Sequence, residues 1–249
     1  MAAYSDWTRW AEKFKLQVLP AIPTSIALCI LNKIQIGKSF ASIRSFFYGI
    51  KFTHVSQGFQ DPTNHHLVRS MLEAAHRICE KTVRKKEPIT VEHIKSLHSV
   101  LLGDTMSLSS YRIFIIILLS YFGFLRYSEV TNIRRCDLIL HESFFKIFIQ
   151  KSKCDVYRDG KWLYICASVD SMYCPLEHIK GYFQMANITD PYSEEFIIRA
   201  ISPLKKTQTA KLRACNKPLS YTTARELFLK SLKLIGVKPQ KFGLHSMRS

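Results

Sequence analysis

The 249-residue sequence lacks most features that mark secreted, metal-binding or nucleotide-hydrolysing proteins. Its seven cysteines are odd in number and never occur as Cys-x-x-Cys, which predicts free thiols in a reducing compartment and neither disulfides nor zinc. The chain does not open with a cationic stretch and an apolar run, so we expect no secretory signal. Histidine and acidic residues are too scattered to predict a metal, and no Gly-rich loop predicts a nucleotide cofactor.

Glycine and proline are also scarce, at nine residues each, whereas 47% of the residues are hydrophobic. This balance favours one large or two small globular domains with a real core and argues against disorder. The longest apolar run, Ile113–Leu125, is interrupted by Ser120 and Gly123. It falls short of the roughly 20 residues that cross a bilayer, so we expect a buried helix and no membrane association.

Acidic residues are in short supply: 19 Asp and Glu stand against 36 Lys and Arg, for a net charge of +17. Residues 1–86 carry 13 basic and 5 acidic side chains, and residues 87–249 carry 23 and 14. Because both parts are cationic, the excess does not come from a single basic tail. It favours a polyanionic partner, most simply nucleic acid. From charge alone, a merely solvated basic surface or an affinity for acidic membranes remains possible.

The first 86 residues predict four helices packed as a small bundle. Tyr4, Trp7 and Trp10 form an aromatic stripe at steps of three, and a second helical pattern covers Thr24–Ile36. Ser39 is placed to cap a third helix, and Asp61-Pro62 predicts the start of a fourth. The apolar residues expected at helical spacing are Ile43, Phe46, Phe47 and Ile50 in the third helix, and Leu67, Met71, Ala74, Ala75 and Ile78 in the fourth.

A charged segment, Lys81–Lys86, follows the fourth helix and is closed by Glu87-Pro88. We interpret it as a linker that divides the chain into domains at 1–86 and 87–249. Within it, Arg84, Lys85 and Lys86 are candidate DNA-binding residues. A solvated helix end accounts for the segment equally well.

The second part begins with helices and adds strands only later. Thr90 is expected to cap a helix that buries Ile94, Leu97 and Leu101, and Ser109 or Ser110 to open an apolar helix ending at Gly123. Two strands, Phe144–Gln150 and Trp162–Cys166, flank a turn at Asp159-Gly160. Further elements are expected as a helix from Pro175 to about Ala186, a short edge strand at Phe196–Ile198, and a helix from Ser220 to near Gly236. The predicted fold class is mostly α, α+β, with a small antiparallel sheet.

Four basic residues in this part stand on distinctive local sequences. Arg126 lies in Gly-Phe-Leu-Arg-Tyr-Ser-Glu, and Lys153 lies in Gln-Lys-Ser-Lys-Cys-Asp at the end of a predicted strand. His245 and Arg248 lie in Gly-Leu-His-Ser-Met-Arg and share a face if this segment is helical. Moving a phosphodiester between oxygens without a metal requires fixed cations around the non-bridging oxygens, and arginine suits this because its planar fork donates two charged hydrogen bonds.

The surroundings of Arg126 favour an anion site. Ser128 is a plausible cap for a helix through Asn132, which would place the guanidinium beside a helix N-terminus. Glu129, three residues on, is placed to hold the guanidinium in one rotamer. Taken alone, Arg126 is more simply a surface arginine paired with Glu129.

In this order and on these local structures, the four residues resemble the tyrosine recombinase, or phage integrase, family of DNA strand-exchange enzymes. The opening aromatic helix, the three helices after it and the basic linker resemble the family's core-binding domain. The resemblance covers nearly the whole chain and looks closest to the eukaryotic mobile-element branch. It implies catalytic roles for Arg126, Lys153, His245 and Arg248, a supporting role for Glu129, and DNA contacts by Lys151.

The resemblance also implies double-stranded DNA as the partner, self-association on that DNA, no cofactor, and a location inside the cell, in the nucleus if the source is eukaryotic. The family's tyrosine nucleophile follows its His-x-x-Arg block, whereas every tyrosine in this sequence precedes His245. We therefore expect an incomplete catalytic domain and no DNA cleavage by this chain alone. A nucleophile supplied by a partner, a non-catalytic DNA-binding protein and a basic scaffold for protein partners remain as alternatives.

Overall fold

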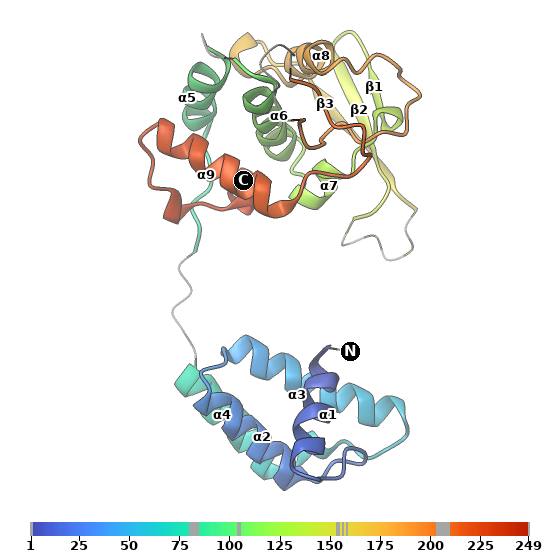
Figure 1. Cartoon of the computed structure of the whole chain (residues 1–249), viewed down its shortest axis with the longest axis vertical. Helices are drawn as coiled ribbons and strands as arrows, with labels where there is room; N and C mark the ends of the chain where they lie inside the picture. The colour runs from blue at the N-terminus through green and yellow to red at the C-terminus, as the bar shows by residue number, and fades with distance from the viewer. Residues whose placement is uncertain are drawn as a thin grey trace. The chain divides into compact units, whose positions relative to one another are not determined.

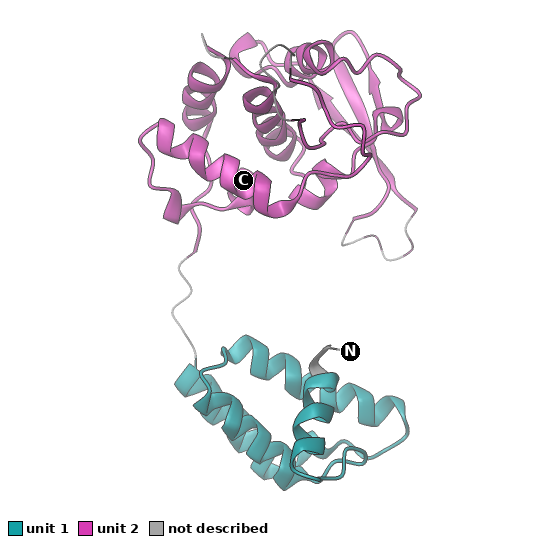
Figure 2. Cartoon of the chain, in the orientation of Figure 1, with its two compact units in different colours: residues 1–84 teal, residues 85–249 magenta. Residues whose placement is uncertain are grey.

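The computed structural model describes residues 2–79, 85–103, 106–152, 155, 157, 159–202 and 210–248. Contacts between residues divide the chain into two compact units, Met1–Arg84 and Lys85–Ser249 (Figure 2). The chain is mostly α with a small antiparallel sheet, as the sequence predicts. None of the helices in the described part has the length and apolarity that crossing a bilayer requires.

The first unit is built from helices joined by short connections (Figure 1). Its elements are α1 (Ala2–Lys13), α2 (Pro23–Gln35), α3 (Phe40–Ser56), the 3₁₀ helix η1 (Pro62–Asn64) and α4 (His66–Cys79). Ser39 caps α3 as expected, because its side chain accepts a hydrogen bond from the backbone N–H of Ser42. Asp61 does the same for Thr63, so the expected start lies one 3₁₀ turn before α4.

Trp7 is at the centre of the core of this unit. It is fully buried, stacks on Trp10 and donates a hydrogen bond from its indole nitrogen to the carbonyl of Val18 at 2.9 Å. The expected inward residues of α3 are all buried. In α4 the expected face is partly wrong: Leu67 and Ile78 are exposed, and Val68 packs inward with Ala75. The buried face of α4 therefore differs from the one that the spacing predicted.

The second unit combines helices with a three-stranded sheet (Figure 1). Its α-helices are α5 (Val91–Leu102), α6 (Leu108–Phe122), α7 (Tyr127–Thr131), α8 (Pro175–Ala186) and α9 (Tyr221–Leu234). Its strands are β1 (Leu138–Leu140), β2 (Phe144–Ile149) and β3 (Lys161–Cys166). Its 3₁₀ helices are η2 (Arg135–Asp137), η3 (Ser171–Tyr173), η4 (Pro239–Lys241) and η5 (Leu244–Met247).

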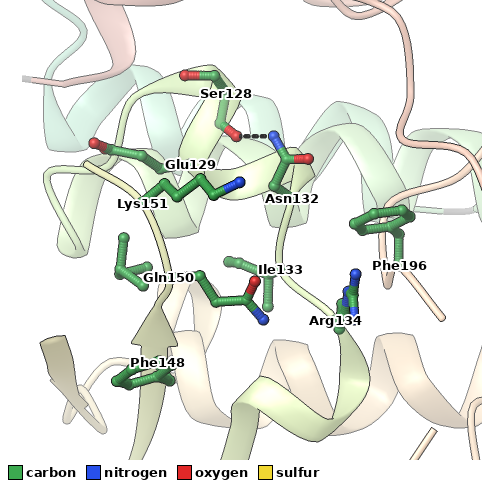
Figure 3. Close-up of a pocket in the computed structure, with 10 residues that line it drawn as sticks. Ser128, Glu129, Asn132, Ile133, Arg134, Phe148, Gln150, Lys151 and Phe196 are labelled. Carbon is green, nitrogen blue, oxygen red and sulfur yellow. Dashed lines mark hydrogen bonds between the residues drawn. The ribbon is translucent and has the colours of Figure 1, made fainter. Parts of the chain in front are cut away.

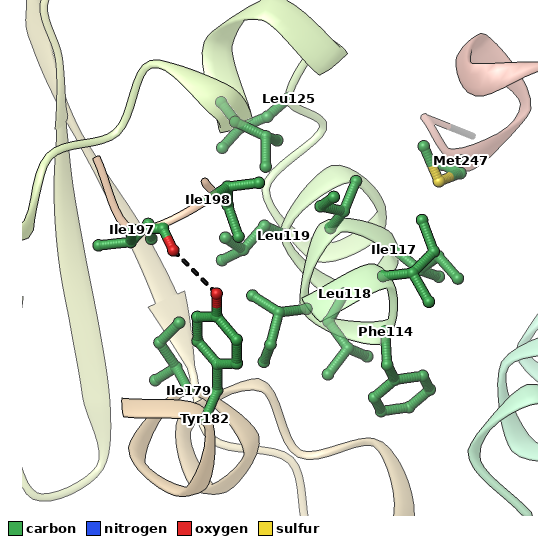
Figure 4. Close-up of a cluster of buried hydrophobic side chains, with 14 of the residues drawn as sticks. Phe114, Ile117, Leu118, Leu119, Leu125, Ile179, Tyr182, Ile197, Ile198 and Met247 are labelled. Atoms are coloured by element: carbon green, nitrogen blue, oxygen red, sulfur yellow. Dashed lines mark hydrogen bonds between the residues drawn. The ribbon is translucent and has the colours of Figure 1, made fainter. Parts of the chain in front are cut away.

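Helix α6 runs through the middle of this unit. Every residue from Ile113 to Leu119 is buried, as expected of a helix that is apolar on all sides. Helices α5, α7, α8 and α9 and the 3₁₀ helix η5 all contact it. Figure 4 shows Leu125 and Met247 alongside α6 in one hydrophobic cluster. The segments on either side of these two residues are therefore positioned by the same helix.

The sheet is antiparallel throughout, in the order β1-β2-β3. Phe145, Ile147 and Ile149 of β2 alternate inward, as the period of a half-buried strand requires. Ile149 pairs with Lys161, so a long connection rather than a tight turn joins β2 to β3, although Gly160 adopts the positive φ that the turn signal predicted. Strand β1 is too short to have been recognised in the sequence.

Two expected details of the second unit are wrong. Ser107, rather than Ser109 or Ser110, caps α6. Residues 196–198 form no strand: Phe196 makes a single bridge to Arg134, and Ile197 and Ile198 are fully buried instead of lying at an edge. Tertiary contacts with the core, which no local pattern reports, decide their position.

Gly123 is the C-cap of α6 as expected, but it does not adopt the left-handed conformation common at helix ends. Its φ is −91°, and the left-handed residue is Phe124 at φ 50°. A Cβ atom at Gly123 would lie 2.7 Å from the carbonyl oxygen of Leu119 and 3.1 Å from side-chain atoms of Leu125 and Ile165. Any larger residue here would have to displace these neighbours.

We expect Gly123→Ala to destabilise the second unit by about 1–3 kcal/mol, because the added methyl group overpacks a backbone contact. Gly243→Ala is the matched control, since the nearest atom to its added Cβ is 4.0 Å away. Hydrogen-exchange mass spectrometry of peptides from α6 measures the effect separately from the first unit. Equal protection of α6 in the two variants would contradict the expectation.

Candidate functional site

A pocket of about 250 Å³ in the second unit brings Arg126 and Arg248 together. Arg126 comes from the α6–α7 connection, and Arg248 follows η5 near the end of the chain. Lys161, at the start of β3, and Glu129 and Ser152 also line it. Two of the four cations expected from the sequence therefore meet in one hollow. Among the described lining residues, Glu129 is the one acidic side chain beside three cations.

Arg126 is held by contacts with Glu129. It forms the N-cap of α7 in an extended conformation, so the expectation that Ser128 caps this helix is wrong. Its backbone N–H donates to one carboxylate oxygen of Glu129 at 2.7 Å, and its Nη1 donates to the other at 2.9 Å. With 23% of its side chain exposed, Arg126 combines a fixed position with access from solvent.

Glu129 is charged at neutral pH despite its burial. Burial by itself raises the pKa of a carboxylate, but hydrogen bonds from the backbone and guanidinium of Arg126 and from the hydroxyl of Ser152 more than offset this. The net result is a pKa below the ordinary glutamate value. Ser152 lies beyond β2, so Glu129 connects the arginine segment to the hairpin.

Arg248 is positioned by its buried neighbours. Leu244 and Met247 of η5 enter the hydrophobic core, whereas Arg248 is exposed and reaches the pocket. The backbone of this segment is fixed from two sides: Gly243 donates to Ser246 Oγ at 3.1 Å, and Ile89 donates to the carbonyl of Ser246 at 2.9 Å. The N-terminal end of the second unit therefore helps to place Arg248.

His245 does not line this pocket in the described structure. It lies on η5, three residues before Arg248, which follows the helix at φ −104° and ψ 81°. Its side chain is exposed, and its carbonyl accepts a hydrogen bond from Arg248 at 3.1 Å. The segment forms a 3₁₀ helix that ends before Arg248 instead of the expected α-helix, so the shared face stays a prediction.

Lys153 lies outside the described residues. Lys161, which sequence reasoning did not select, lines the pocket from the opposite strand of the hairpin. Its pairing with Ile149 carries it to the same end of the sheet as the β2 residues that precede Ser152. The signal was its place directly after the Asp159-Gly160 turn, at the point where the hairpin returns to the core.

Lys151 lines a neighbouring pocket of about 440 Å³, together with Asn132, Arg134 and Gln150 (Figure 3). Glu129 and Ile149 contribute to both pockets, so the two are adjacent. Figure 3 shows the ammonium group of Lys151 reaching over this pocket on the side of Asn132. Lys151 is exposed and available to a ligand beside the Arg126–Arg248 pocket.

Of the expected linker cations, Arg84 lies outside the described residues, and Lys85 and Lys86 are exposed. Lys86 donates a hydrogen bond from its ammonium group to the carbonyl of Gln240. The next residue, Glu87, forms an ion pair with Lys241 at 2.8 Å. Lys86 therefore anchors the first residues of the second unit to η4, and it also carries a charge at the surface.

Comparison with models of known protein families gives no match, and neither does comparison with curated protein sequences. Solved structures do match. A Tn1549 transposon integrase in complex with transposon right end DNA aligns with 99% of this chain at a TM-score of 0.61 and 14% identity. A lambda integrase dimer bound to a COC' core site aligns with 99% at 0.55 and 17%. The chain has the fold of the tyrosine recombinases.

A third example is the XerH site-specific recombinase bound to difH, which aligns with 89% of the chain at a TM-score of 0.54 and 15% identity. The chain spans 61% of the lambda integrase chain, 77% of the Tn1549 chain and 57% of the XerH chain. The TM-scores establish the tyrosine recombinase fold. At identities this low, the activity has to be argued from the site.

Replacing Glu129 with glutamine should lower stability at neutral pH by about 1–3 kcal/mol, because the ionised carboxylate accepts charged and backbone hydrogen bonds. Since the folded pKa lies below the ordinary value, this contribution is present above the ordinary pKa and is lost as the pH falls through the folded pKa. Thermal unfolding followed across this acidic range measures it. Glu226→Gln, an exposed change on α9, is the control. A difference that stayed constant with pH would contradict this assignment.

Proposed function

We propose that this protein binds double-stranded DNA and holds one backbone phosphate between Arg126 and Arg248, as a recombinase- or integrase-like protein of DNA strand exchange. The observation that carries the proposal is the convergence of these two arginines and Lys161 in one pocket with a single described carboxylate. The fold supports it, because its solved examples named above are complexes with DNA.

The chemistry of the pocket suits a phosphodiester under attack. Two guanidinium groups hold non-bridging oxygens by charged hydrogen bonds and offset the negative charge that develops at phosphorus. Glu129 keeps the Arg126 guanidinium oriented toward the pocket, so little reorganisation accompanies binding. In this proposal Lys153 or Lys161 protonates the departing sugar oxygen, and His245 assists proton movement.

Both parts of the chain contribute in this proposal. Residues 1–86 are a helical core-binding domain, and residues 87–249 form the catalytic domain. Each part has a basic excess, which matches phosphate contacts along a duplex. We infer self-association on DNA, since solved examples of the fold include a lambda integrase dimer on a core site and a lambda integrase tetramer on a Holliday junction. Action inside the cell follows from a DNA substrate, and a nuclear location follows only for a eukaryotic source.

The nucleophile is the part of the reaction that the pocket does not supply. No tyrosine is among its described lining residues. Tyr127 is next to Arg126 in sequence, but burial raises its pKa, and its hydroxyl donates to the carbonyl of Leu219 at 2.6 Å. Tyr182 is fully buried, and its hydroxyl donates to the carbonyl of Ile197. We therefore propose that residues 1–249 by themselves bind DNA without cleaving it.

A second candidate function is DNA binding without chemistry, in a protein derived from a mobile-element recombinase. The same use of Tyr127 and Tyr182 as structural donors favours it. Both candidates use the same phosphate pocket. They differ in whether a tyrosine, from a longer form of the chain or from a partner protein, enters that pocket.

Arg248→Ala should weaken binding to duplex DNA about 10- to 100-fold, because a charged hydrogen bond to phosphate is lost from an exposed site that the fold does not need. Arg126→Ala should weaken it at least as much. For each variant, the slope of log affinity against log salt should become shallower by about one unit. Fluorescence anisotropy across a salt series measures both quantities.

Arg225→Ala, on the exposed side of α9 and outside the pocket, is the matched control and should have a smaller effect. Circular dichroism checks that Arg126→Ala is folded, and Arg248→Ala tests the pocket even if it is not. Weak DNA affinity that hardly changes with salt would overturn the proposal in favour of a protein-binding scaffold.

A suicide DNA substrate, which traps a covalent intermediate, should yield no adduct with the polypeptide of residues 1–249, because the described lining of the pocket includes no tyrosine hydroxyl. Denaturing gel electrophoresis is the measurement. An adduct would refute the proposed inactivity. Adduct formation by a longer chain from the same locus, or after addition of a tyrosine-bearing partner, would favour the enzyme over the non-catalytic binder.

A further inference from the structure

A larger cavity, of about 750 Å³, lies in the second unit where α6 and α9 begin, and we refer to it as the α6–α9 pocket. Ser107 and Ser109 line it from the start of α6, and Ser220 and Thr223 line it from the start of α9. Ser107 and Ser220 are the N-caps of these helices of 15 and 14 residues. Two helix N-termini, each with a partial positive charge, therefore border one cavity.

Arg112 forms part of the wall of this pocket from within α6. Its side chain is almost entirely buried, with 3% of the residue exposed. Its Nη1 donates to the carbonyl of Arg199 at 2.6 Å, and its Nε has no hydrogen-bond partner among the described residues. No described carboxylate forms an ion pair with it, and the ion pair of Glu195 is with Arg199.

Among the described residues, this arrangement leaves the positive charge of Arg112 without a counter-charge. Burying a guanidinium without a counter-charge is costly, so such groups are ordinarily paired. The α6–α9 pocket has no acidic residue among its described lining residues, and Arg213 and Lys217 add two further cations. Neither α6 nor α9 carries an acidic residue in its first turn. An anion in the cavity would supply the negative charge that Arg112 and the two helix N-termini lack.

We propose that the α6–α9 pocket binds a phosphate group, with Arg112 and the N-termini of α6 and α9 as its recognition elements. The size of the cavity and its apolar walls, which include Ile201, Leu219 and Leu227, suit a phosphate attached to a nucleoside-sized body. The phosphate can come from a free mononucleotide or from a nucleotide at the end of a DNA strand. The proposal is independent of the DNA function, because the described lining residues of the α6–α9 pocket include none that line the Arg126–Arg248 pocket.

Cys215 provides a local reporter, because it is a free, exposed cysteine that lines the α6–α9 pocket. A bound phosphate covers the thiol and disfavours its thiolate form, and both effects slow alkylation. Cys136 and Cys166 are also free and exposed but do not line this pocket, so they are internal controls in the same molecule. Alkylation by iodoacetamide at each cysteine is measured by peptide mass spectrometry.

We expect inorganic phosphate, added at constant ionic strength, to slow alkylation of Cys215 at least fivefold and to leave Cys136 and Cys166 unchanged. Arg112→Gln should abolish the protection. Arg213→Gln and Lys217→Gln, at exposed positions, should each raise the phosphate concentration required by about threefold, the effect of one partly screened charge. Arg225→Gln on α9 and Arg126→Ala should leave the protection unaltered.

Deoxythymidine monophosphate and a 5′-phosphorylated oligonucleotide distinguish the two sources of phosphate. The source is the one whose probe protects Cys215 from alkylation at the lower concentration. The proposal would be overturned if none of the three probes slowed the alkylation of Cys215. Protection that survives in folded Arg112→Gln would also overturn it. If Arg112→Gln does not fold, the Arg213 and Lys217 variants decide, and protection unaffected by both would overturn it.

Discussion

Burial of α6 is the constraint on which the rest of the second unit depends. The helix is apolar on every side, so other elements must surround it. Leu125 and Met247 are two of the residues that do so, and each precedes an arginine in the sequence. The hydrophobic contacts that build the core thereby bring Arg126 and Arg248 to one pocket. The same packing that stabilises the fold sets the spacing of the cations.

The electrostatics of the pocket depend on Glu129. If the pocket held cations alone, repulsion between them would favour conformations in which the arginine side chains point outward into solvent. Glu129 fixes Arg126 through both its backbone and its guanidinium, and it receives a hydrogen bond from Ser152 of the hairpin. It thus secures one arginine while leaving the pocket with more positive than negative groups. Arg248 is fixed differently, through buried neighbours and the backbone of Ile89.

The two arginine pockets of this unit differ in how their charge is balanced. Arg126 has a carboxylate partner and access to solvent, as a site for a large polyanion requires. Arg112 is buried, bonded to a carbonyl and bordered by two helix N-termini. A DNA backbone offers its phosphates along an exposed surface, whereas a cavity accepts a small group or a strand end. Both sites contain an arginine, and they differ in how deeply that arginine is buried.

The sequence by itself determined most of the helices, the two hairpin strands and two of the three cations of the pocket, Arg126 and Arg248, because these follow from local periodicity, capping residues and short motifs. Ser39 and Thr90 cap the helices where their side chains predicted, and Ile43 and Leu97 face inward as their spacing required. The tertiary structure decided what local pattern does not encode. It buried Ile197 and Ile198 in place of an edge strand, made Arg126 the cap of α7, and brought Lys161 into the pocket by cross-strand pairing. The meeting of Arg126 with Arg248, and the isolation of Arg112 from any described carboxylate, depend on contacts between residues far apart in the chain, which only packing around α6 fixes.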